Sequence, residues 1–127
     1  LINMQTGIFG YKGRIHFQAG LCINDELETL RGLPKTEIFT HVSEIIDSYI
    51  HRNYRLYPAN YIACDMLDGN TSMAEHYTEE DKLKFEAYLQ KKIGLIDIPN
   101  KDVDFLRQCI LTMYANPAKN HLQAIRK

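Results

Sequence analysis

Arginines and tyrosines gather in one short stretch of the chain, which makes this stretch the strongest candidate for a binding site. Residues 50–65 read IHRNYRLYPANYIACD. The side chains in it that can contact a ligand are Arg52, Arg55, Tyr57 and Asn60. Arginine pairs with carboxylates and phosphates, and tyrosine and asparagine donate further hydrogen bonds to such groups. The pattern predicts a site for an anionic ligand. The alternative is a helix junction in which the aromatic rings pack and the arginines reach water.

A first histidine pattern suggests metal binding but is incomplete. His41, Glu44, Ser48 and His51 fall on one arc of an expected helix, where they could surround a metal ion. A helical di-metal site needs Glu-x-x-His on two helices, whereas here the order is reversed and occurs once. We therefore interpret these residues as a solvated polar face and expect no metal ligand.

A second pattern, formed by His76 and Asp81, has the spacing of a pair in which a carboxylate orients a histidine base. Asp81 already has a structural role, because the run from Thr78 to Asp81 resembles a capping box at the start of a helix. No glycine-rich or arginine-bearing phosphate motif follows the histidine. We therefore expect no catalytic residue and no cofactor.

A corner between two helices must position the candidate binding residues. Pro58 disfavours helical geometry at Tyr57, so one helix should end near Tyr54 and the next should begin at Pro58. The first of these helices, which starts at Lys35, has the best amphipathic pattern, and we expect it to carry much of the core. Its apolar positions are Ile38, Val42, Ile45, Ile46, Tyr49 and Ile50.

Caps and turns predict the other helices at residues 24–31, 58–67, 78–94 and 99–114, with a short separate helix after Pro117. A loop should occupy residues 69–77, after the turn signal Asp68-Gly69-Asn70. The residues expected to face the core in the last two long helices are Leu83, Ala87, Leu89, Ile93, Val103, Leu106, Ile110 and Met113.

The N-terminal residues show strand periodicity instead. Residues 8–10 and 14–19 could pair around a glycine turn at 10–13, with Ile15 and Phe17 facing a core. An isolated hairpin is marginally stable, so it should lie on helices, join a neighbouring chain as a homodimer, or be the edge of a severed α/β sheet. The predicted fold is a single α+β domain over residues 1–127, mainly α-helical. A β-hairpin within residues 1–23 would precede four to six helices in residues 24–127.

Composition limits the function classes. The chain has 127 residues, and 15 cationic against 16 acidic side chains give a net charge of -1, so we expect no nucleic-acid partner. Cys22, Cys64 and Cys109 are widely spaced and odd in number, which favours reduced thiols and a cytoplasmic protein. Because the sequence starts without methionine, we expect it to be a fragment of a longer protein.

Three stretches resemble the C-terminal part of bacterial glycerol-phosphate acyltransferases, which act in phospholipid biosynthesis. They are residues 4–17, residues 51–65, and residues 105–117. The resemblance implies that residues 13–20 are similar to the strand and glycine that close the catalytic α/β domain. It also implies a missing N-terminal catalytic domain as partner, with acyl-CoA, acyl carrier protein or the surface of the inner membrane as further candidates. The His-x4-Asp and Phe-Pro-Glu-Gly motifs of the family are not found here in the expected order, so the fragment alone should be inactive.

Three readings of function follow, of which the least favoured is a metal-dependent enzyme built on His41, Glu44 and His51. The first is a noncatalytic C-terminal region of a glycerolipid acyltransferase that supports acceptor, acyl-carrier or membrane-surface binding. The second is a helical protein–protein interaction module unrelated to lipid chemistry.

Overall fold

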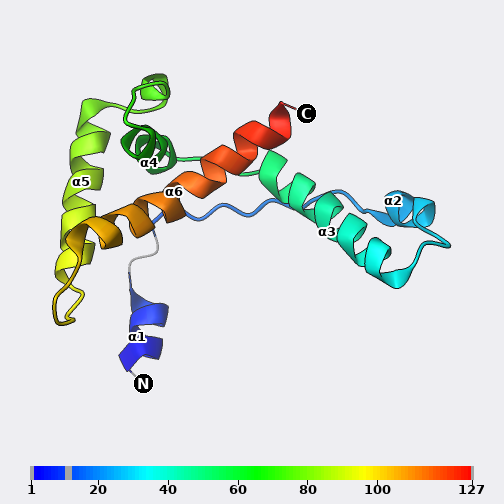
Figure 1. Ribbon diagram of the computed structural model, residues 1–127, viewed down its shortest axis with the longest axis horizontal. Helices are drawn as coiled ribbons and strands as arrows, with labels where there is room; N and C mark the ends of the chain where they lie inside the picture. Colours follow the sequence, from blue (N-terminus) through cyan, green and yellow to red (C-terminus); the bar gives the residue numbers. More distant parts are fainter. Residues whose placement is uncertain (1, 11–12, 127) are drawn as a thin grey trace.

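The computed structural model describes residues 2–10 and 13–126, and every regular element in these ranges is a helix (Figure 1). The α-helices are α1 (Ile2–Phe9), α2 (Asn24–Thr29), α3 (Lys35–Arg52), α4 (Pro58–Asp68), α5 (Glu79–Gly94) and α6 (Val103–Ile125), and a 3-10 turn, η1, spans Ala74–His76. The helices predicted to begin near residues 24, 35, 58 and 78 are confirmed to within a residue or two at their starts.

The predicted β-hairpin, and with it the α+β fold class, is wrong for the described residues. Residues 2–9 form α1, residues 13–23 form no regular element, and residues 11–12 of the expected turn lie outside the described ranges. The described chain contains neither a strand nor a sheet of which this segment could be the edge. The physical reason is that alternating side chains favour an extended backbone, whereas a strand also requires a hydrogen-bonded neighbour.

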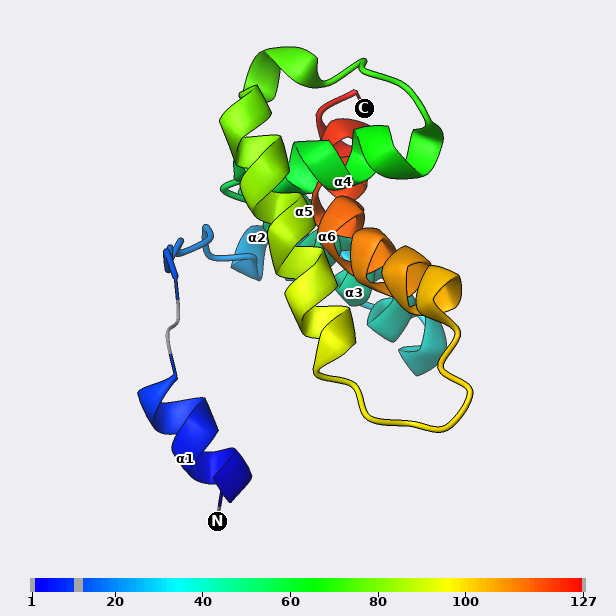
Figure 2. The same cartoon turned by 90° about the vertical axis from the view of Figure 1, so that its left-hand side faces the viewer.

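The hydrophobic core lies where α4 crosses α6, with α5 packed against both (Figure 2). Its buried residues are Ile62, Ala63, Cys64, Phe85, Leu89, Leu111, Ala115 and Ala118. At its edge the Tyr114 hydroxyl donates to the Tyr88 hydroxyl at 2.8 Å, and the Tyr114 ring meets Phe85 edge to face. Burial, together with the hydrogen bond to Tyr88, raises the pKa of Tyr114 to about 12. The phenol therefore stays neutral and can keep its place in the core.

Helix α3 adds no buried side chain to this core, contrary to the prediction that it would carry much of it. The C-terminal end of α3 contacts α6, where the Nδ1 atom of His121 lies 2.8 Å from the carbonyl oxygen of His51, and the rest of the helix projects away from the bundle (Figure 1). Its exposed apolar side chains are Phe39, Ile46 and Ile50. The helical period shows that a helix is amphipathic but does not show which surface covers its apolar face.

A buried carboxylate holds the loop that connects α4 to α5. Asp65 is only 4% exposed. Its oxygens accept hydrogen bonds from the backbone N–H of Met73, at 3.1 and 3.2 Å, and from the hydroxyl of Tyr77 at 2.7 Å. The bond to Asp65 raises the pKa of Tyr77 to about 12. Gly69 begins the loop with φ 62, a left-handed conformation that glycine adopts without strain.

Two polar contacts fix the far end of the bundle. Arg107 of α6 forms a double hydrogen bond with Glu86 of α5 at 2.7 and 2.6 Å. The bond from this guanidinium lowers the pKa of Glu86 and raises that of Arg107. Lys101 donates to the carbonyl oxygens of Ile93 and Ile96, both at 3.0 Å, and so closes the C-terminal end of α5. The connection from α5 to α6 is therefore tied back onto the bundle.

Pro117 does not start a separate helix, as the sequence pattern predicted, but lies inside α6. Proline removes one backbone donor and weakens the helix around the preceding turn. Side chains of α4 bond to carbonyl oxygens in that turn: the Asn60 amide donates to Tyr114 at 2.8 Å, and the Cys64 thiol donates to Ala115 at 3.6 Å. These tertiary contacts hold the turn before Pro117 against α4, and α6 continues through the proline.

We expect Thr78→Ala to lower the free energy of unfolding by about 1 kcal/mol at neutral pH, because Thr78 caps α5. Its hydroxyl accepts from the Asp81 backbone N–H at 3.1 Å, and its own N–H donates to the Asp81 carboxylate at 3.0 Å. The hydroxyl also donates to the Asp81 carboxylate at 2.7 Å, and this bond, with the one from the Thr78 N–H, lowers the pKa of Asp81. The contribution of the hydroxyl bond is therefore present above the usual Asp pKa and is lost as the pH falls through the lowered value. The difference between the two proteins, measured by urea denaturation, should therefore shrink in acid. A difference that grows in acid would contradict this.

Candidate functional site

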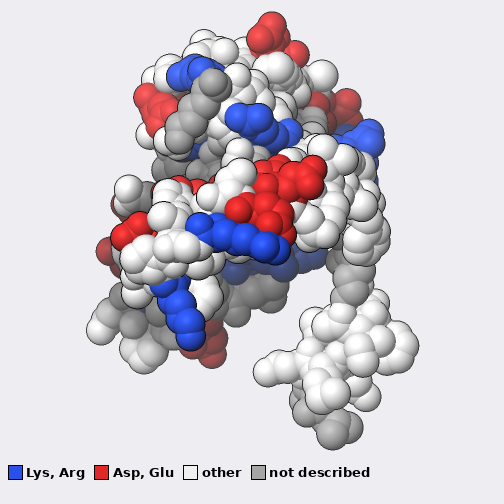
Figure 3. Space-filling view, turned by 90° about the vertical axis from the view of Figure 1, so that its right-hand side faces the viewer, with Lys and Arg blue, Asp and Glu red and all other residues white. Residues whose placement is uncertain are grey.

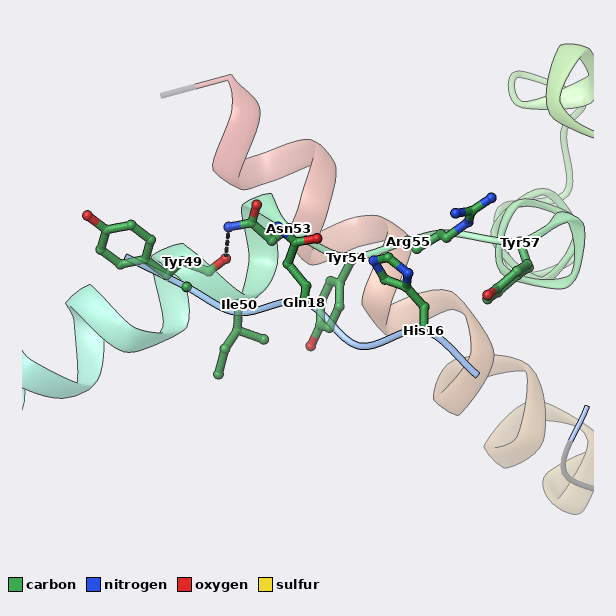
Figure 4. Close-up of a pocket in the computed structure, with 9 residues that line it drawn as sticks. His16, Gln18, Tyr49, Ile50, Asn53, Tyr54, Arg55 and Tyr57 are labelled. Carbon is green, nitrogen blue, oxygen red and sulfur yellow. Dashed lines mark hydrogen bonds between the residues drawn. The ribbon is translucent and has the colours of Figure 1, made fainter. Parts of the chain in front are cut away.

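A cleft of about 320 Å³ lies between the extended N-terminal segment and the corner that joins α3 to α4 (Figure 4). The residues that line it are His16, Gln18, Gly20, Tyr49, Ile50, Asn53, Tyr54, Arg55 and Tyr57. The first three come from the extended segment, and the others come from the end of α3 and the connection that follows it. Three tyrosines and an arginine therefore share one open cavity.

The chemistry of the cleft favours an anion. Arg55 supplies a fixed positive charge, and His16, Gln18 and Asn53 add groups that can form hydrogen bonds. None of the described lining residues is acidic. A guanidinium without a nearby carboxylate keeps its donors for a ligand.

Backbone geometry at the corner places these side chains. Asn53 ends α3, with its side-chain amide donating to the Tyr49 carbonyl at 2.8 Å. Pro58 starts α4 and holds Tyr57 extended, at φ -123 and ψ 160. Residues 53–57 therefore cross from one helix to the next without helical twist, and Tyr54, Arg55 and Tyr57 all border the cleft.

The structure brings together only two of the four predicted binding residues, Arg55 and Tyr57. Arg52 borders a different hollow, between α2 and α3, together with Glu26 and Glu44. Asn60 is used internally: its Oδ1 accepts from the Tyr57 N–H at 2.9 Å while its amide group donates into α6. Asn60 therefore orients the corner and is not among the residues that line the cleft.

Sequence reasoning missed the contribution of His16 and Gln18. The signal was present in the alternation of residues 14–19, where the expected apolar face, Ile15 and Phe17, implies an opposite polar face. The polar face is the one that meets the corner. Two residues before His16, the Arg14 guanidinium lies 6.0 Å from the centre of the Tyr57 ring, a cation–π contact.

The two histidine patterns do not form sites in the structure. Asp81 bonds to Thr78 in the capping box, and His76 stacks on Tyr61 with ring centres 4.2 Å apart. His41 lies 3.4 Å from Glu44, an exposed contact on the surface of α3. Across residues 2–10 and 13–126, no group of three metal-binding side chains is close enough to hold an ion.

The molecular surface shows no concentration of one charge on the face drawn in Figure 3, where acidic and basic side chains are mixed over the main body. Helix α1 carries no charged residue. Within the described part of the chain, no helix is both long and apolar enough to cross a membrane. Comparison with known proteins gives no match to any family model, any curated protein or any solved structure.

Proposed function

We propose that this chain is the noncatalytic C-terminal region of a glycerolipid acyltransferase and that its corner cleft helps to hold a phosphate group of the acceptor. The observation that carries the proposal is the composition of the cleft, whose described lining residues include Arg55 together with hydroxyl, amide and imidazole side chains and no carboxylate. Residues 51–65, which resemble the acyltransferases, include Asn53, Tyr54, Arg55 and Tyr57 of the cleft wall. A lipid headgroup or an acidic acyl carrier protein presents similar anionic chemistry.

The exposed first half of the chain supports a role beside another domain. None of the described side chains before Ile62 is buried. The exposed large apolar side chains of this first half are Met4, Ile8, Phe9, Ile15, Phe17, Leu21, Leu27, Leu33, Phe39, Ile46 and Ile50. Apolar surface of this extent is typical of interaction sites. We propose that a catalytic acyltransferase domain covers part of it.

We expect Arg55→Ala to weaken binding of glycerol 3-phosphate by about 10- to 100-fold, since a hydrogen bond to a charged group contributes about 1.5–3 kcal/mol. Arg52→Ala is the matched control, because it removes the same charge three residues away and outside the cleft. The affinity of the Arg52→Ala variant for glycerol 3-phosphate should stay within about twofold of that of the parent, as expected for a charge far from the ligand. Calorimetric titration with glycerol 3-phosphate measures the affinity, and the same titration with glycerol shows how much of the binding depends on the phosphate group. Vesicles with and without phosphatidic acid then distinguish a soluble acceptor from a lipid headgroup.

An equal loss of affinity for glycerol 3-phosphate in the Arg55→Ala and Arg52→Ala variants would contradict a site at the cleft. It would indicate only general attraction between opposite charges. If the parent binds neither glycerol 3-phosphate nor anionic vesicles, the second candidate function applies. That candidate is a helical interaction module, and the specific observation in its favour is the exposed apolar side of α3.

A further inference from the structure

The extended segment, residues 14–22, has two different sides. His16, Gln18 and Gly20 line the cleft. The intervening apolar residues point the other way: Ile15, Phe17 and Leu21 are exposed, and Phe17 is 89% exposed. This is the period of a β-strand whose polar side borders the cleft and whose apolar side has no partner among the described residues.

The backbone of this segment is also unused. Among the described residues, no backbone N–H or C=O from residues 14–22 hydrogen-bonds to another backbone group, and every residue in this range is exposed. An extended backbone with free donors and acceptors is a template for pairing with another strand. The described chain offers no strand to pair with it.

We infer that residues 14–22 pair in antiparallel orientation with the same residues of a second copy of this chain. Gln18 is the midpoint of residues 14–22, so with the symmetry axis there every residue of the segment has a partner, and residues whose numbers sum to 36 lie opposite each other on the same side. The resulting pairs are Ile15 with Leu21 and Phe17 with Ala19. A register centred on Ala19 would place Ile15 opposite Ile23, whose carbonyl oxygen already accepts from the backbone N–H of Leu27 at 3.0 Å.

Charge is compatible with this pairing. Residues 1–23 contain no acidic side chain, and the cation within the paired range, Arg14, lies opposite Cys22 and not opposite its own copy. A two-stranded ribbon is marginal by itself, so the dimer should be weak and depend on concentration. The inferred dimer goes beyond the proposed function, because its formation does not depend on what binds in the cleft.

Sedimentation of the full chain over a range of concentrations tests the inference. The parent should pass from monomer to dimer, and Phe17→Lys should remain monomeric over the same range, because it removes an apolar cross-strand contact. Leu83→Lys is the matched control: Leu83 is a large apolar residue of α5 that is 70% exposed and lies outside the segment. This variant should dimerise like the parent. A parent that is monomeric throughout would overturn the inference, as would equal weakening by both lysines.

A charge exchange at the symmetry axis tests the register. In the Gln18→Lys variant two lysines face each other, and in the Gln18→Glu variant two glutamates do, so each variant alone should be monomeric where the parent is dimeric. An equimolar mixture should restore the dimer, and added salt should weaken that mixed dimer. A mixture that associates no better than its components would overturn pairing around Gln18.

Discussion

Replacing Asp65 with alanine should lower the free energy of unfolding by about 2–6 kcal/mol. The carboxylate accepts from the Met73 backbone and the Tyr77 hydroxyl, and removing it leaves both donors unsatisfied, at roughly 1–3 kcal/mol each. The side chain is almost fully buried, so water cannot replace the lost acceptor without opening the loop. Urea denaturation followed by circular dichroism measures the change.

Two companion variants separate the loop contacts. Tyr77→Phe removes one bond to the carboxylate and should cost about 1–3 kcal/mol, whereas Ser72→Ala removes a long 3.4 Å contact of an exposed residue and should cost no more than about 0.5 kcal/mol. Tyr77→Phe should add little to Asp65→Ala, because the partner is already gone. If the Asp65→Ala chain kept the parent stability to within about 1 kcal/mol, the carboxylate would not be what holds the loop.

Leu89→Ala should lower the free energy of unfolding by about 2–5 kcal/mol, because Leu89 is fully buried between α4, α5 and α6 and its loss leaves a cavity. Leu83→Ala provides the control on the same helix. That leucine is largely exposed, and its replacement should change stability by no more than about 0.5 kcal/mol. Thermal and urea denaturation of the two variants measures the contrast. Similar losses in both would mean that α5 presents a different face to the core.

Helix starts were predictable because they depend on local chemistry. Pro58 and the Thr78 capping box act within a few residues, and both helices begin where these signals place them. The core was less predictable. Leu83 satisfies the helical period as well as Leu89 does, but only the packing of α4 and α6 decides which one is buried. The continuation of α6 through Pro117 was not predictable, because the α4 residues that bond to the preceding turn are far away in sequence.

The candidate site was predicted in part for the same reason. Arg55 and Tyr57 reach the cleft because Pro58 fixes the backbone beside them. Arg52 still belongs to α3, so it follows the helical twist to another side. His16 lies in a segment that folds back from a distant part of the chain, and no local rule joins it to Arg55.

The crossing of α4 and α6 has a consequence for how quickly the chain can fold. Cys64 and Ala115, which touch at its centre, are 51 positions apart, and Asn60 and Tyr114 are 54 apart. A loop of this length must close before α4 and α6 can contact each other, and the entropy lost in closure slows folding relative to helical proteins in which only neighbouring helices pack. Early formation of the loop clasped by Asp65 and of α5 would shorten the free length that has to close. Residues 69–102 can therefore control the rate of core assembly although few of their side chains belong to the core.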